Sequence, residues 1–363
     1  MHIVHTIAEL RQAISSAARP AFVPTMGNLH RGHLSLLEQA RELGDCTVAS
    51  IFVNRLQFLP SEDFDRYPRT WDADCQALAS VNCDVLFAPR EQDLYPEPQR
   101  FKVMADPALA AKLEGAFRPG FFDGVCTVVL KLFVAVFAGK TQGVAVFGKK
   151  DYQQLKVVEA MTKQFALPLS IVAGETARDS DGLALSSRNA YLTDAQRKQA
   201  CTLYQQLLHF AERYRIQSLA DQVIEGEQSQ EPHERLADWV ARAEQAAKES
   251  LQAQGWQVDY LSLRRCADLE PAYMMEPTHT LEPTHKLEPA YKLEAVDKLE
   301  ATQALEPTDK AKPAHAADPA RDLEYRQPPG NEHKAECGLE GQALVLLAAA
   351  RLGQTRLIDN LEL

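Results

Sequence analysis

The stretch Ala21-Phe-Val-Pro24-Thr-Met-Gly-Asn-Leu-His30-Arg-Gly-His33 decides the fold of the first half of the chain. Its apolar start, Ala21 to Pro24, predicts a short buried strand. A helix is expected over residues 33–43, because the apolar residues there fall on one face and Gly44 follows. A strand that turns through glycines into a helix is typical of parallel α/β sheets.

The same alternation continues beyond this stretch. Further strands are expected at Cys46–Val53, Asp84–Phe87, Gly143–Phe147 and Leu169–Val172. Val125–Ala138 is the most apolar segment, but it is too short for a membrane span and contains Lys131, so a buried helix is expected. Residues 1–176 are therefore predicted to form a Rossmann-like α/β domain, with helices on both faces of a parallel sheet.

The second half of the chain changes pattern. Thr193 and Gln196 have the spacing of a capping box, which predicts a helix to about Tyr214, and a second helix is expected over residues 233–254. Strands are expected at 257–263 and 344–347, as a pair. Residues 177–363 are predicted to form a smaller α+β domain.

A six-residue repeat interrupts this second domain. It recurs in forms such as Leu281-Glu-Pro-Thr-His-Lys and Leu287-Glu-Pro-Ala-Tyr-Lys. Regular prolines block a long helix, and one leucine per repeat buries too little surface to offset the entropy of ordering. Residues 267–336 are predicted to be a disordered, low-complexity insert. The alternative is that the repeat recruits a partner.

Composition excludes several functions. The chain has 363 residues, 45% of them hydrophobic, and a formal net charge of −11, which argues against a non-specific nucleic-acid binder. Residues 1–14 do not have the pattern of a signal peptide. Seven cysteines without a CxxC pair indicate reduced thiols in a cytoplasm, and neither a disulfide framework nor a zinc site.

The strongest candidate site is the turn that holds His30 and His33. Gly27 and Gly32 allow a phosphate to approach the backbone, and the start of the helix offers free N–H groups to it. The two histidines lie on one side of the first turn and can donate hydrogen bonds to phosphate oxygens. A His-x-x-His metal pair is the alternative, but it lacks a third ligand nearby. A turn with two exposed histidines is another.

Three further segments place polar groups at strand or loop ends. They are Gly182 to Asn189 with its Ser-Ser-Arg run, Phe147 to Gln154 with Lys149-Lys150-Asp151, and Ile51 to Phe58 with Asn54 and Gln57. The first can close over a triphosphate, the second can hold phosphates and ribose, and the third can hydrogen-bond a hydroxy acid. Alone, the first two are equally consistent with a polar surface turn, and for the third a polar loop is the favoured interpretation.

Taken together, these segments resemble the pantothenate synthetases, within the nucleotidyltransferase superfamily that includes class I aminoacyl-tRNA synthetases. Pro24 to His33 is similar to the HIGH motif, and Asp181 to Asn189 is similar to the KMSKS loop. The strings at 67–70, 122–125, 150–154 and 347–360 match the family in its order.

The resemblance implies ATP-dependent joining of pantoate to β-alanine through an acyl-adenylate. It implies ATP contacts from Met26, Gly27, Asn28, Leu29, His30, Arg31, Gly32, His33, Gly148, Lys149, Lys150, Asp151, Ala177, Leu185, Ser186, Ser187 and Arg188. It also implies that Gln57 and Gln154 bind pantoate and that Gln57 lies by β-alanine. The implied catalytic residues are His33 as proton donor, and His30, Lys150, Ser186, Ser187 and Arg188 around the transferring phosphate. Weaker implied positions are Asn54 and Arg118.

The resemblance further implies Mg²⁺ with no assigned protein ligand, a homodimer, and no nucleic-acid or membrane partner. The chain departs from the usual family residues at Arg55, Lys149 and Phe121, and in its insert. Another adenylyl- or cytidylyltransferase with the same motif pair is the alternative enzyme. A scaffold that has lost activity is the alternative outside enzymes.

Overall fold

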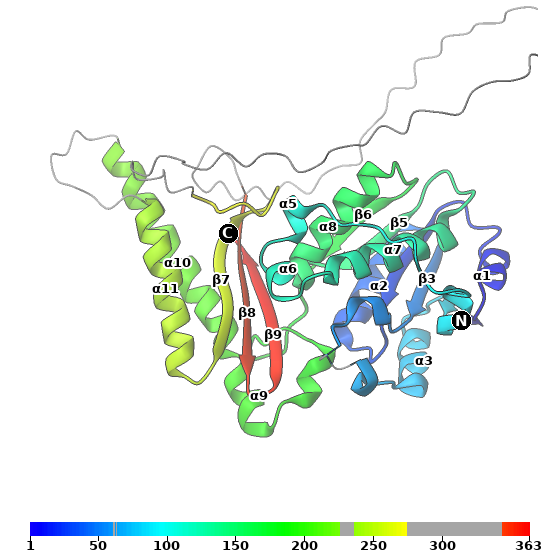
Figure 1. Cartoon of the computed structure of the whole chain (residues 1–363), viewed down its shortest axis with the longest axis horizontal. Helices are drawn as coiled ribbons and strands as arrows, with labels where there is room; N and C mark the ends of the chain where they lie inside the picture. Colours follow the sequence, from blue (N-terminus) through cyan, green and yellow to red (C-terminus); the bar gives the residue numbers. More distant parts are fainter. Residues whose placement is uncertain (61, 63, 226–235, 274–342) are drawn as a thin grey trace, which may run out of the picture. The chain divides into compact units, whose positions relative to one another are not determined.

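The chain folds into two sheets with helices around them (Figure 1). The computed structural model describes residues 1–60, 62, 64–225, 236–273 and 343–363. Its strands are β1 (His2–Val4), β2 (Pro20–Thr25), β3 (Cys46–Ile51), β4 (Val85–Phe87), β5 (Val144–Gly148), β6 (Ser170–Gly174), β7 (Gln257–Arg265), β8 (Leu344–Leu352) and β9 (Thr355–Glu362).

Helices connect most of these strands. The α-helices are α1 (Ile7–Ala13), α2 (Arg31–Leu43), α3 (Trp71–Ser80), α4 (Glu91–Leu94), α5 (Pro107–Ala110), α6 (Glu114–Phe117), α7 (Phe121–Phe137), α8 (Tyr152–Gln164), α9 (Asp194–Ala200), α10 (Thr202–Glu225) and α11 (Leu236–Ala253). Short 3-10 turns are η1 (Arg55–Gln57), η2 (Phe64–Arg66), η3 (Lys149–Asp151) and η4 (Ser187–Tyr191).

The larger sheet has six parallel strands in the order β1-β4-β3-β2-β5-β6. Its central strand β2 sends alternate side chains into two cores. Phe22 packs edge-on against Phe133 of α7, on the face that α1 and α8 also cover. Ala21 and Val23 pack with Leu37 of α2 on the opposite face, which α3 also covers. The predicted Rossmann-like architecture is therefore confirmed.

The predicted buried helix is α7, and most of its side chains are buried. No helix in the described part of the chain has the length and apolar character needed to cross a membrane.

The smaller sheet is antiparallel, in the order β7-β8-β9, and α10 and α11 pack against it. β8 contributes side chains to two different cores, one on each face of the strand. Leu346 joins the core beneath α10 and α11, whereas Val345 and Leu347 pack with Leu113 and Tyr152 of the first half. The predicted pairing of the strands around residues 259–263 and 344–347 is confirmed, with Leu263 opposite Leu346.

Details of the second half refine the predictions. The Thr193–Gln196 capping box is present, but the expected single helix breaks at Cys201 into α9 and α10, and α10 runs on to Glu225. Residues 267–273 of the expected insert are described, and Leu269 is fully buried. The rest of that segment lies outside the described residues. The division of the chain at residue 176 stays a prediction.

The topology also locates a crevice. From β2 the chain moves outward to β3 and then β4, whereas β5 lies on the other side of β2. Ligands of open α/β sheets bind outside the carboxyl ends of the strands at such a switch point. The turns that follow β2 and β5 are the segments around His30 and Lys150.

Candidate active site

A buried carboxylate shapes the turn after β2. Asp74, on α3, accepts hydrogen bonds from the backbone nitrogens of Asn28 (2.9 Å) and Leu29 (2.7 Å). Gly27 and Asn28 have φ angles of +82° and +50°, which glycine and asparagine tolerate best. Sequence reasoning missed Asp74, since its position on a helix carries no sign that it is buried.

The two motif histidines lie against each other as neutral rings. Their ring centroids are 4.0 Å apart, and the backbone nitrogen of His30 donates to Nδ1 of His33 (3.3 Å). Because Nδ1 accepts this bond, the proton of a neutral His33 lies on Nε2. Burial, with the charge of Lys150 adding to it, lowers the pKa of His30 to about 4. Burial, then His30 and Lys150, lowers the pKa of His33 to about 3. Both rings are hydrogen-bond donors rather than imidazolium acids near neutral pH.

The turn after β5 carries two lysines with different surroundings: Lys150 lines the cavity, whereas Lys149 forms ion pairs outside it. Lys150 lies 3.8 Å from the Asp151 carboxylate, and both line the main cavity. The ammonium of Lys149 pairs with Glu175 (2.6 Å) and Glu362 (2.7 Å). The expected contact of Lys149 with ATP stays a prediction.

The third motif touches the first. Ser187 Oγ donates to the carbonyl of Asn28 (3.1 Å), and Asn28 Nδ2 donates to the carbonyl of Ser187 (3.3 Å). Arg31 donates to the carbonyl of Arg178 (2.7 Å) at the start of the same loop. The fold therefore brings together two motifs that lie far apart along the chain. Groups that act on one phosphate have to be held at a fixed distance from one another, and these hydrogen bonds supply such a connection.

Gln57, which also lines the cavity, is held by two neighbours. Its Nε2 donates to Met26 Sδ (3.1 Å), and its Oε1 accepts from Asn54 Nδ2 (3.2 Å). Asn54 is itself buried, donates also to the carbonyl of Gly124 and accepts from Tyr95. Asn54 thus orients Gln57, and we do not assign it to the substrate.

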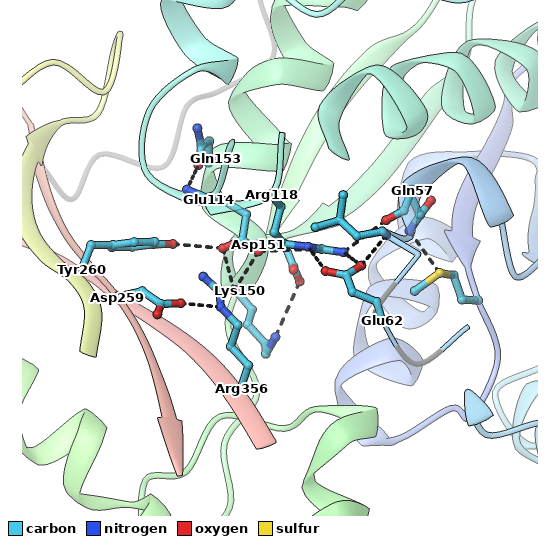
Figure 2. Close-up of polar contacts among 12 residues, drawn as sticks. Gln57, Glu62, Glu114, Arg118, Lys150, Asp151, Gln153, Asp259, Tyr260 and Arg356 are labelled. Carbon is cyan, nitrogen blue, oxygen red and sulfur yellow. Dashed lines mark hydrogen bonds and ion pairs between the residues drawn. The ribbon is translucent and has the colours of Figure 1, made fainter. Parts of the chain in front are cut away.

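A chain of ion pairs crosses the cavity from the first half to the smaller sheet (Figure 2). Arg118 pairs with Glu62 (2.7 Å) and with Glu114 (3.3 Å). Arg356 of β9 then pairs with Glu114 (2.8 Å) and with Asp259 of β7 (2.7 Å). These ion pairs connect the smaller sheet to α6. Of the residues that form them, the sequence indicated only Arg118 as a site residue.

The cavity holds about 730 Å³, a size suited to small-molecule substrates. Among the predicted site residues, those that line it are Met26, Gln57, Lys150, Asp151, Gln154, Ser186 and Arg188, and the weaker candidate Arg118 lines it as well. The remaining ones do not line it: Gly27, Asn28, Leu29, His30, Arg31, Gly32, His33, Gly148, Lys149, Ala177, Leu185 and Ser187. Many of these form the turns behind it, as the contacts above describe.

Comparison with known proteins decides the family. A family model described as Pantoate-beta-alanine ligase matches residues 2–296. The chain belongs to this family. A pantothenate synthetase from Paracidovorax citrulli is 59% identical over 270 residues, which cover 74% of this chain and 89% of that protein.

Solved structures agree with the ligase family. The crystal structure of pantothenate synthetase from Thermus thermophilus has a TM-score of 0.69 at 34% identity and covers 99% of both chains. A pantoate-beta-alanine ligase from Francisella tularensis, complexed with beta-gamma ATP and beta-alanine, has the same fold, with a TM-score of 0.59 at 24% identity; the match covers 99% of this chain and 97% of that one. The resemblance inferred from the motifs and the assignment to a ligase are confirmed.

The three residues expected to depart from the usual ones of the ligase family have structural partners. Arg55 stacks on Phe64 (3.8 Å), and Phe121 lies under the guanidinium of Arg118 (3.7 Å). Lys149 makes the ion pairs described above. These side chains are thus held by neighbours around the site.

Proposed function

We propose that this chain makes pantothenate from pantoate, β-alanine and ATP through a pantoyl-adenylate. The observation that supports this best is that Lys150, Ser186 and Arg188 line the same cavity as Gln57 and Gln154. The first group suits phosphates and the second suits a neutral hydroxy acid.

In the first step, a pantoate carboxylate oxygen attacks the α-phosphorus of ATP, and the bond to the pyrophosphate oxygen breaks. Lys150 and Arg188 balance the charge on the phosphates, and Ser186 offers a hydroxyl donor. The hydroxyl of Ser187 is engaged with the Asn28 carbonyl, so Ser187 supports the turn instead. Neutral His33 lies in the turn behind the cavity, and we assign it a hydrogen bond from Nε2 to a phosphate oxygen, in place of the proton-donor role that the resemblance implies. Gln57 and Gln154 hold the hydroxy acid in line with the phosphorus.

In the second step, the amine of β-alanine attacks the activated carbonyl, loses a proton, and AMP leaves. Gln57 is assigned to both the acyl group and the amine, and its place in the lining of the same cavity as Lys150 supports this. No protein nucleophile is needed, so the cysteines are not assigned a role.

We also propose that Mg²⁺ accompanies the triphosphate. No group of three or more His, Cys, Asp or Glu side chains suited to a metal occurs among the described residues. Mg²⁺ commonly keeps several waters and binds through substrate phosphates, so this arrangement fits it. When bound, it would neutralise phosphate charge, and no protein ligand is assigned.

A homodimer in the cytoplasm is proposed as well. The homodimer is what the resemblance to the ligase family implies, and Phe101 and Met104, which are 91% and 83% exposed, are apolar side chains that a second copy would cover. Light scattering on the purified chain tests the mass. The cytoplasmic assignment rests on the cysteine pattern and is tested by cell fractionation.

The test of the reaction uses the full chain with ATP, Mg²⁺, pantoate and β-alanine. Pantoate-dependent pyrophosphate release, followed by AMP and pantothenate, is expected. Lys150→Ala should slow adenylate formation by about two orders of magnitude. Lys156→Ala is the matched control, since Lys156 pairs with Glu159 on α8 and does not line the cavity. Pyrophosphate release without pantoate, or none at all, would refute the proposal.

A further inference from the structure

The last strand, β9, holds the lysine turn through one buried amide. Asn360 is 5% exposed, and its Nδ2 donates to the carbonyls of Lys149 (2.8 Å) and Lys150 (2.9 Å). Both hydrogens of the amide are therefore used on consecutive peptide groups of η3. Glu362, two residues further on, pairs with the Lys149 ammonium (2.7 Å). The backbone that carries Lys150 is thus fixed from a strand more than 200 residues away along the chain.

The neighbouring residue of β9 holds the loop of the other phosphate motif. Asp359 is 4% exposed and accepts two hydrogen bonds from Arg178, at 2.7 and 2.8 Å. Arg178 also donates to the carbonyls of Gly182 (3.0 Å) and Asn360 (3.1 Å) and stacks on Tyr204. This guanidinium therefore ties the start of the loop that leads to Ser186 and Arg188 to β9.

The two anchors sit on one rigid support. Asp359 and Asn360 are consecutive, and β8 pairs with both through Ala348 and Leu347. The backbone nitrogen of Asn360 also donates to Asp359 Oδ1 (2.8 Å), which holds the Asp359 carboxylate against the backbone of β9. A movement of β9 would therefore shift the lysine turn and the serine-arginine loop together.

We infer that Asp359 and Asn360 are positioning residues for adenylate formation, which set the spacing of Lys150 relative to Ser186 and Arg188 around the phosphates. The inference rests on the proposed function. A displacement of about 1 Å in such a site costs on the order of 100-fold in rate. Once pyrophosphate has left, the second step no longer needs that spacing. A purely structural role would instead reduce both steps equally.

The experiment measures the two half-reactions separately. Asn360→Asp has the same shape, but it sets an oxygen against two carbonyl oxygens. Asp359→Asn likewise keeps its shape and weakens the pairing with Arg178. Glu244→Gln is the control, because Glu244 is a half-buried acid that accepts from Leu263 N (2.7 Å) and does not line the cavity.

Wild type must first make pantothenate from ATP; if it does not, the proposed function fails before the inference is tested. We expect Asn360→Asp and Asp359→Asn to lower the rate of pantoate-dependent pyrophosphate release at least tenfold. Amide formation from supplied pantoyl-adenylate should stay within threefold of wild type. Glu244→Gln should leave the rates of both half-reactions unchanged. If a variant is poorly folded, Asn360→Ser gives the same comparison. Equal losses in both half-reactions, or unchanged adenylate formation, would overturn the inference.

Discussion

The neutral histidine pair makes stability depend on pH in a defined direction. Unfolded histidines titrate near pH 6.5, whereas burial lowers the pKa of His30 to about 4 and that of His33 to about 3. Between those values the unfolded chain binds more protons than the folded chain. Stability contributed by this pair is therefore complete above about pH 6.5 and is lost as the pH falls towards 3.

The size of the effect follows from these pKa values. Lowering the pH from about 7 to about 5 protonates each histidine in the unfolded chain and leaves the folded rings mostly neutral, which costs about 2 kcal/mol per ring. The rings interact and are partly reached by solvent, so the pair should contribute about 2–4 kcal/mol to the loss.

Urea unfolding at the two pH values measures this loss. The double variant His30→Gln/His33→Gln has no titrating ring at these positions, so its free energy of unfolding should fall less than that of wild type by the stated amount. His209→Gln, at an exposed position on α10, is the control and should retain the wild-type pH dependence. Equal pH dependence in wild type and the double variant would refute the assignment of two buried neutral rings.

Three further outcomes are expected. Gln57→Ala and Gln154→Ala should each weaken pantoate binding by about 1–3 kcal/mol, which raises the KM for pantoate roughly 5- to 150-fold and leaves the KM for ATP unchanged in steady-state assays; the reverse would mean that the subsites are exchanged. Arg356→Met should cost about 3 kcal/mol in urea unfolding, because it leaves Glu114 buried without that partner, and adding Glu114→Gln should recover part of the loss. Replacing residues 274–342 with a short Gly/Ser turn should leave kcat unchanged, because the end of β7 is paired with the start of β8 and loop length has little effect on closure entropy. Loss of activity in a variant that still folds would argue for a role of that segment.

The sequence predicts the elements whose apolar pattern is long or repeated. Strands β2 to β6 were expected within a few residues, and so was α7. β1 was missed because three residues, His2 to Val4, are too few to show a period. β9 was missed because Asp359 and Asn360, which are buried, interrupt its apolar alternation. A local pattern gives no reason to bury an aspartate.

The residues of the candidate site also fall into two groups, those that the sequence reveals and those that it does not. The motifs located Lys150, His33 and Ser186 because glycines, charges and strand ends are local signals. The partners that orient those segments have no such signal. Asp74 looks like any acidic residue in the first turn of a helix, yet it accepts two backbone bonds from the histidine turn.

This division has a physical cause. A segment that meets phosphates must expose donors and allow close backbone approach, so its composition is constrained where it stands in the sequence. A group that positions this segment only has to be buried and paired, and any distant strand can supply it. In Arg356-Leu-Ile-Asp-Asn360 the three polar residues bind Glu114, Arg178 and the lysine turn, all from other parts of the chain. These residues are polar at buried positions of a strand because their partners are supplied by other parts of the chain. The pairing exists only in the folded protein, so the sequence alone does not reveal it.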